Sequence, residues 1–264
     1  MAYLGGKSKG ASHILEVLND PIFNGFAFVE PFVGMCHILR RVTNKSSYTV
    51  SDGSLLLVEL LRNIQRGGEN CNVCEQTYKA LKTAYFDGTL LERQRLVAAY
   101  AAYTYSFMGV MWGGYCVASG RRRYVEERVR YYDRLKQNAA FVAASISCFD
   151  YRDIEAHTKL DEKTLVYCDP PYDNGCRHAS APSSSGQFTY GTTFNSEQFW
   201  DFVRDLSAKG VSVIVSEYDA PSDFLLISSA TKTQTTGRGK RRLMNENVYA
   251  HKTSWFAQHF AQRE

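Results

Sequence analysis

The stretch Phe26-Ala27-Phe28-Val29-Glu30-Pro31 gives the first clear indication of the fold. Its apolar run from Phe26 to Val29 is typical of a short buried strand. Pro31 lacks a backbone donor and cannot continue the ladder, so the strand is expected to end at Glu30-Pro31 and pass into a loop.

Helices and strands alternate on both sides of this strand. The expected elements are a helix from Ser8 or Ser12 to Leu18, a helix over His37 to Val42, a strand over Tyr48 to Ser51 that ends in Asp52, and an amphipathic helix over Ser54 to Gln65 closed by Gly67-Gly68. Such alternation predicts an α/β fold with a parallel sheet covered on its faces.

The same alternation returns later in the chain. It comprises strands over Ile146 to Phe149 and Leu165 to Cys168, a helix over Ser196 to Ala208 stopped by Gly210, and a strand over Val211 to Val215. Residues 68–144 lack strong strand runs and are rich in Tyr, Arg and Gly. We expect one domain made of residues 1–67 and 145–264, with residues 68–144 as an inserted, mostly helical subdomain.

Composition places the chain among ordinary globular proteins: 264 residues, 44% apolar and 22% charged, are enough for a sizeable core. Apolar runs such as Leu55 to Leu61 are far shorter than the roughly 20 residues of a membrane span, and no secretory signal is present. We therefore expect a soluble, cytoplasmic protein in a prokaryotic cell or a phage or virus host. Seven irregularly spaced cysteines favour free thiols; Cys71 and Cys74 have no second pair to complete a zinc site, so no metal is expected.

Basic residues gather in two places, although the net charge is only +4. The first cluster consists of Arg121, Arg122, Arg123, Arg128, Arg130, Arg134 and Lys136, and the second of Arg238, Lys240, Arg241 and Arg242. Two such clusters suit a polyanion. A solvated helix face and a solvated loop are the alternative for either cluster alone.

Two candidate binding positions follow the first two strands, because ligands of open parallel sheets bind beyond the carboxyl ends of the strands. The loop over Phe28 to Gly34 turns sharply enough for a nucleotide-like ligand to approach its backbone. Asp52 follows 22 residues after Glu30, a spacing that suits acceptance of hydrogen bonds from ribose hydroxyls. An ordinary turn aspartate is the alternative.

The most specific motif is Asp169-Pro170-Pro171-Tyr172, directly after the strand over Leu165 to Cys168. Consecutive prolines restrict φ to about −65° and fix the carbonyl between them. Asp169 and the Pro170 carbonyl can then accept both protons of an amino group on a planar base while Tyr172 stacks on the ring. The nitrogen becomes a better nucleophile through preorganised acceptors, without a base of raised pKa.

The order of these motifs resembles the alpha group of N6-adenine DNA methyltransferases, the Dam-like family. The matching stretches are Tyr3 to Lys7, Phe28 to Gly34, Gly109 to Tyr115, Val166 to Tyr172, Phe188 to Tyr190 and Val215 to Pro221. The resemblance implies a Rossmann-like, S-adenosylmethionine-dependent methyltransferase sheet with an inserted target-recognition subdomain and double-stranded DNA as partner. It also implies contacts of S-adenosylmethionine with Tyr3 and Lys7 at the methionine end, with the loop residues Glu30, Phe32 and Gly34, with Asp52 at the ribose, with Asp150 and Tyr151 at the adenine, and with Asp169 beside the methyl group.

A base inside a duplex cannot reach such a site, so the adenine is expected to flip out and stack on Tyr172, with Phe188 or Tyr190 on its other face. The two basic clusters would neutralise phosphates. Side chains between Tyr105 and Arg123, Trp112 among them, are candidates for reading bases, with a structural aromatic cluster as the alternative.

The sequence departs from the family at three places and leaves alternatives open. Cys36 stands where the cofactor loop usually has a second glycine, Gly53-Ser54 follows Asp52 where an asparagine is frequent, and Trp112 to Tyr115 differ from the best-known relatives. An RNA or N4-cytosine methyltransferase is one alternative, and a decayed, non-catalytic DNA-binding protein is another. The recognition sequence, a restriction partner and the choice between monomer and dimer stay open.

Overall fold

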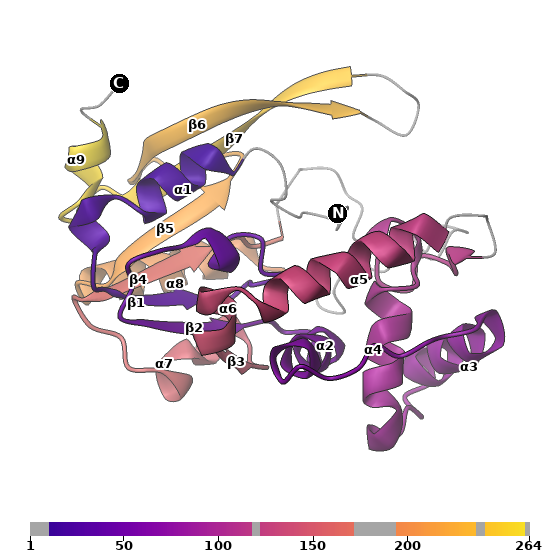
Figure 1. Cartoon of the computed structure of the whole chain (residues 1–264). Helices are drawn as coiled ribbons and strands as arrows, with labels where there is room; N and C mark the ends of the chain where they lie inside the picture. Colours follow the sequence, from indigo (N-terminus) through magenta and orange to yellow (C-terminus); the bar gives the residue numbers. More distant parts are fainter. Residues whose placement is uncertain (1–10, 118–121, 172–193, 236–240, 262–264) are drawn as a thin grey trace.

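The computed structural model describes residues 11–117, 122–171, 194–235 and 241–261 (Figure 1). Its described strands form one seven-stranded sheet in the order β3-β2-β1-β4-β5-β7-β6. The strands are β1 (Ala27–Glu30), β2 (Ser47–Ser51), β3 (Ser145–Ser147), β4 (Thr164–Cys168), β5 (Ser212–Glu217), β6 (Phe224–Thr235) and β7 (Arg241–His251). The first five are parallel, and β7 is antiparallel to both of its neighbours. The predicted α/β class is confirmed, and so is the parallel pairing of β1 to β5, but the sheet as a whole is mixed.

Both faces of the central strands are covered. Every residue of β4 and β5 is buried, as expected of parallel strands with helices on each side. Along β4, Leu165 and Tyr167 belong to one apolar core, whereas Val166 and Cys168 belong to a second core on the other face. The alternation follows from the two-residue period of a strand.

Helices pack on each face of the sheet. Those described are α1 (Ser12–Leu18), α2 (Leu55–Gln65), α3 (Glu75–Phe86), α4 (Arg95–Tyr103), α5 (Arg122–Lys136), α6 (Ala139–Ala143), α7 (Ile154–His157), α8 (Ser196–Ala208) and α9 (Ala257–Ala261). Phe199 and Val203 of α8 lie in the second core. None of these helices is long and apolar enough to cross a membrane.

Residues 68–144 are mostly helical, as predicted, and form α3 to α6. Their apolar side chains are continuous with those of the sheet: Tyr100 of α4 and Tyr132 of α5 belong to the same core as Phe28 of β1. The amphipathic helix α2 lies between the sheet and these helices, with Leu57 and Leu61 fully buried. The inserted helices are therefore packed onto the sheet rather than attached by a linker.

The helix expected over His37 to Val42 is wrong in type: this segment contains turns and a short 3₁₀ helix, Leu39–Arg41. Arg41 N bonds to Ile38 O at 2.8 Å and Val42 N to Leu39 O at 3.1 Å, the i→i+3 pattern of a 3₁₀ turn. The backbone of Leu39 also hydrogen-bonds Glu30. Competition from this contact keeps the segment from continuing as an α-helix.

Strands β6 and β7 form a long hairpin that projects beyond the rest of the sheet (Figure 1). No strand after Val215 is expected from the sequence. The β6 sequence FLLISSATKTQT turns polar along its length, and its second half carries no alternating apolar pattern that would predict a strand.

Candidate active site

Three loops that carry acidic side chains meet at one edge of the sheet. Glu30 is the last residue of β1, Asp52 follows β2, and Asp169 follows β4. Strand β1 lies between the other two, with Glu30 opposite Val50 and Val29 opposite Val166. Because the strands are parallel, all three carboxylates lie beyond the same carboxyl edge, where ligands of such sheets bind.

Glu30 is a buried acid with an unused acceptor. Its side chain is 2% exposed, and Oε2 has no hydrogen-bond partner among the described residues. Burial raises the pKa of Glu30 well above its usual value, the negative charge of Asp169 raises it further, and the backbone hydrogen bond from Leu39 acts in the opposite direction. Such an orphaned acceptor suits a ligand that brings an amine or hydroxyl donor.

Asp52 connects the loop after β1 to the end of β2. Its Oδ2 accepts a hydrogen bond from Gly34 N at 3.2 Å, and its Oδ1 accepts one from Ser54 N at 2.9 Å. Burial raises the pKa of Asp52 to about 6, against the lowering effect of these two N–H groups. Ser54 also caps α2, because its hydroxyl oxygen accepts a 3.4 Å hydrogen bond from Leu57 N. Asp52 therefore lies between the end of β2 and the N-terminus of α2.

The loop after β1 has two residues in the left-handed backbone region. Gly34 has φ 49°, and Cys36 has φ 57°. Glycine adopts this region without steric cost, whereas a residue with a Cβ pays for it. Cys36 thus keeps the backbone that the usual second glycine would favour, and its fully buried thiol has a pKa raised mainly by burial.

An aromatic cluster forms one wall beside this loop. The rings of Phe32 and Tyr151 lie 5.3 Å apart, and Phe194 and Phe199 pack against Phe32 at 6.3 and 5.9 Å. Asp150 accepts hydrogen bonds from Arg152 N at 3.0 Å and from Arg152 Nε at 2.7 Å, which lower its pKa. The structure therefore brings Phe32 and Tyr151 together, and Arg152 binds the carboxylate of Asp150 beside them.

The diproline turn is accessible in part: Asp169 is partly buried, Pro170 is buried, and Pro171 is exposed. The rest of the predicted site, comprising Tyr172, Tyr3, Lys7, Phe188 and Tyr190, lies outside the described residues. Only the first part of the motif can thus be placed, and it lies at the same edge as Glu30 and Asp52.

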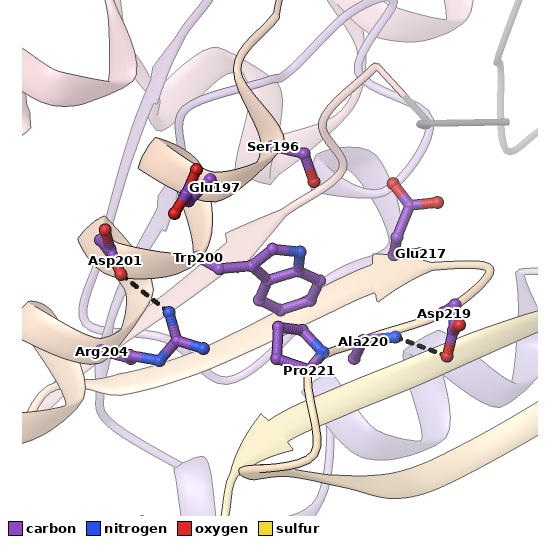
Figure 2. A pocket seen from close by; sticks show the side chains of 9 residues that line it. All are labelled: Ser196, Glu197, Trp200, Asp201, Arg204, Glu217, Asp219, Ala220 and Pro221. Atoms are coloured by element: carbon purple, nitrogen blue, oxygen red, sulfur yellow. Dashed lines mark hydrogen bonds and ion pairs between the residues drawn. The ribbon is translucent and has the colours of Figure 1, made fainter. Parts of the chain in front are cut away.

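An open pocket of about 600 Å³ lies between the start of α8 and the loop after β5 (Figure 2). Its lining comes from the start of α8 and the loop after β5, and the indole of Trp200 lies beside Pro221. Because Cys168 pairs with Val215, Glu217 at the end of β5 stands level with Pro170. Trp200 belongs to none of the sequence motifs, so sequence reasoning did not find its place in this pocket.

Two of the predicted DNA contacts are wrong. Arg128 is 2% exposed and donates hydrogen bonds to the carbonyl oxygens of Thr104 and Ser106. Trp112 is fully buried, with ring centroids 5.4 Å from Tyr78 and 5.7 Å from Tyr85. Arg128 ties α5 to the backbone after α4, and Trp112 belongs to a structural aromatic cluster.

The spacing of apolar residues in the sequence indicates that Arg128 is buried. Val125, Arg128, Tyr132 and Leu135 are all buried and follow one another at three- and four-residue steps along α5. Arg122 and Arg123 lie off this stripe and are exposed, the former 3.8 Å from Glu126. The other predicted phosphate contacts, Arg121, Arg238, Lys240 and the side chain of Arg241, are outside the described part of the chain.

Comparison with solved structures finds distant likenesses to several enzymes. The rRNA methyltransferase aviRa from Streptomyces viridochromogenes has 13% identity and a TM-score of 0.41, with 95% of this chain and 88% of that chain covered. The putative methyltransferase yhhF from Escherichia coli has 9% identity and a TM-score of 0.36, with 94% and 90% covered. A precorrin 8W decarboxylase from Methanobacterium thermoautotrophicum has 8% identity and a TM-score of 0.37, with 94% of each chain covered.

No curated protein matches the chain. A family model, by contrast, matches residues 3–94 and 99–235, which include all three acidic loops and the diproline turn; its description is "D12 class N6 adenine-specific DNA methyltransferase". The match spans most of the sequence, and the chain therefore belongs to the D12 class of N6 adenine-specific DNA methyltransferases, which use S-adenosylmethionine to methylate DNA.

Proposed function

We propose that Asp169 and the Pro170 carbonyl accept the two N6 protons of the target adenine, beside S-adenosylmethionine held by the loop after β1 and by Asp52. The observation that carries this proposal is the meeting of Glu30, Asp52 and a partly exposed Asp169 at one edge of the sheet. Tyr172 is assigned the stacking contact with the base.

The side chains at this edge fit the cofactor chemically. S-adenosylmethionine carries an amine and two ribose hydroxyls, and Glu30 offers a buried acceptor with no partner in the described chain. Asp52 has two oxygens that already accept N–H bonds and can each accept another. When bound, the cofactor supplies the methyl group on its sulfonium. Phe32 and Tyr151 form the apolar wall for its adenine.

Asp169 acts by position and charge. Two fixed acceptors draw the N6 protons away from the ring plane and leave the nitrogen lone pair free for in-line attack. Because the acceptors are set before the base arrives, little reorganisation is needed during the reaction. Strand β5, which ends at Glu217 in the open pocket lined by Trp200, pairs with β4, and we assign this pocket to the extruded base.

DNA is assigned to the helical insert and the hairpin. Arg122 and Arg123 are exposed at the start of α5 and, with Arg121, Arg238, Lys240 and Arg241, would neutralise phosphates of double-stranded DNA. In this proposal residues 68–144 are the target-recognition subdomain, and residues 1–67 and 145–264 form the catalytic domain. The enzyme would work in the cytoplasm, alone or with a restriction partner.

The test is Asp169→Ala, assayed for methyl transfer to DNA by nucleoside mass spectrometry. We expect loss of N6-methyladenine with retained folding, because a partly exposed carboxylate next to the buried Glu30 supports chemistry rather than the core. Glu162→Ala is the matched control, since Glu162 is an exposed acid just before β4, at the opposite end of the same strand. Methylation by Asp169→Ala at the parent rate would show that the site is assigned wrongly.

A further inference from the structure

The cofactor loop is tied to the recognition subdomain by one buried tyrosine. Tyr131 of α5 donates a hydrogen bond from its hydroxyl to the carbonyl oxygen of Met35 at 2.7 Å. The two residues are 96 positions apart in the sequence, and the hydrogen bond is buried. Met35 lies between Gly34 and Cys36, the two loop residues in the left-handed region.

The surroundings of Tyr131 keep its hydroxyl a donor. Burial raises the pKa of Tyr131 far above its usual value, so the hydroxyl stays protonated at any pH of interest. His37 Nδ1 lies 3.2 Å from the same oxygen. Burial, followed by the charge of Arg40, lowers the pKa of His37 to about 3. A neutral His37 can therefore donate Nδ1–H to the oxygen whose own proton goes to Met35.

The hydrogen bond from Tyr131 restrains the loop next to Cys36, whose backbone is strained. A non-glycine residue in the left-handed region is strained and persists only where the surroundings hold it. The described restraints on residues 34–36 are the Gly34–Asp52 bond, a 2.9 Å bond from Cys36 N to Val33 O, a 3.4 Å bond from Arg40 N to Cys36 O, and the Tyr131 bond to Met35. Of these four, only the Tyr131 bond comes from the inserted helices.

We infer that Tyr131 is a positioning residue for S-adenosylmethionine, which holds the loop over Gly34 to Cys36 in its binding conformation from the side of the recognition helix. This inference rests on the proposed cofactor site. It assigns to α5 a second role besides its exposed arginines, since one helix then carries both the DNA-facing Arg122 and Arg123 and the restraint on the cofactor loop.

The experiment compares Tyr131→Phe with Tyr132→Phe. Tyr132 is the next residue of α5, is also buried, and shares a 2.9 Å hydrogen bond with the Thr104 hydroxyl, away from the loop. Tyr131→Phe loses the contacts with Met35 and His37, and Tyr132→Phe loses the bond with Thr104, so both variants are expected to lose thermal stability. In calorimetric titration of the full chain, S-adenosylmethionine binding should weaken by roughly 3- to 10-fold in Tyr131→Phe and stay unchanged in Tyr132→Phe.

A second arm tests the reason for the effect. Cys36→Gly removes the backbone cost, so Cys36→Gly in the Tyr131→Phe background should recover most of the lost affinity. Equal cofactor affinity of Tyr131→Phe and the parent, or no recovery with Cys36→Gly, would overturn the inference. Glu30→Gln separates this failure from that of the proposed site: if it also leaves the affinity unchanged, the cofactor site itself is placed wrongly.

Discussion

Asp52 leads to a prediction with a defined pH range. Its pKa of about 6 lies well above the usual 3.8 because the side chain is buried. If the ionised form holds the ribose hydroxyls, the apparent affinity for S-adenosylmethionine is proportional to the ionised fraction. That fraction is about one eleventh at pH 5 and about ten elevenths at pH 7, so binding should be about tenfold tighter at pH 7.

The same ionisation has the opposite effect on the stability of the free protein. The folded pKa exceeds the unfolded value, so the contribution of Asp52 to stability is fully present below pH 3.8 and is lost as the pH rises through about 6. At about 1.36 kcal/mol per pH unit, the difference between 3.8 and about 6 corresponds to about 3 kcal/mol. Cofactor affinity thus increases over the range in which this contribution to stability decreases.

The assay is calorimetric titration of S-adenosylmethionine from pH 5 to pH 7, with urea unfolding of the free protein over pH 4 to 7. Asp52→Asn should bind the cofactor weakly and lose most of the pH dependence in both measurements. Cys36 and Cys148 face Asp52, but burial raises the pKa of both thiols, which stay neutral here. Glu30→Gln shows what the other buried acid contributes. A tenfold change that survives in Asp52→Asn would refute the reasoning.

Two further predictions concern groups whose burial decides their role. Arg128→Met should lower the free energy of unfolding by about 2–4 kcal/mol, because the buried carbonyl of Thr104 loses its donor. Arg122→Ala should instead leave urea unfolding unchanged and weaken DNA binding in a gel-shift titration at low salt. A stable Arg128→Met variant with impaired DNA binding would contradict this assignment of a structural role to Arg128. Glu30→Gln should raise the melting temperature at pH 7.5, since burial opposes the charged form of Glu30. The same variant should weaken S-adenosylmethionine binding. A lower melting temperature with unchanged binding would mean that Glu30 has only a structural role.

Much of the sheet and its acidic edge could be predicted because local patterns determine them. The strand over Leu165 to Cys168 and the helix over Ser196 to Ala208 match β4 and α8 almost residue for residue. Parallel strands then force Glu30, Asp52 and Asp169 to one edge, whatever the details of the loops. Periodicity and strand direction are short-range properties, and a single sequence contains them in full.

The failures depend on long-range contacts. Arg128 was grouped by charge with its exposed basic neighbours, although its spacing places it on the buried face of α5. The contact between Tyr131 and Met35 spans 96 residues and leaves no mark on either local sequence. The long β6–β7 hairpin is not predicted because the second half of β6, SATKTQT, is polar and lacks the alternating apolar pattern of a half-buried strand.

The acidic side chains at the carboxyl ends of β1 and β2 lower the stability of the free protein. Glu30 and Asp52 are buried without a cationic partner among the described residues, and the charge of Asp169 adds to the cost at Glu30. At the proposed site, a sulfonium cofactor with an ammonium group would bring the missing positive charge, so its binding would relieve this repulsion and stabilise the fold. The inserted helices share the core with the sheet, and through Tyr131 they reach the backbone of the cofactor loop. If α5 contacts DNA as proposed, a shift of α5 on DNA would therefore be transmitted through the Tyr131–Met35 bond to the loop between Gly34 and Cys36.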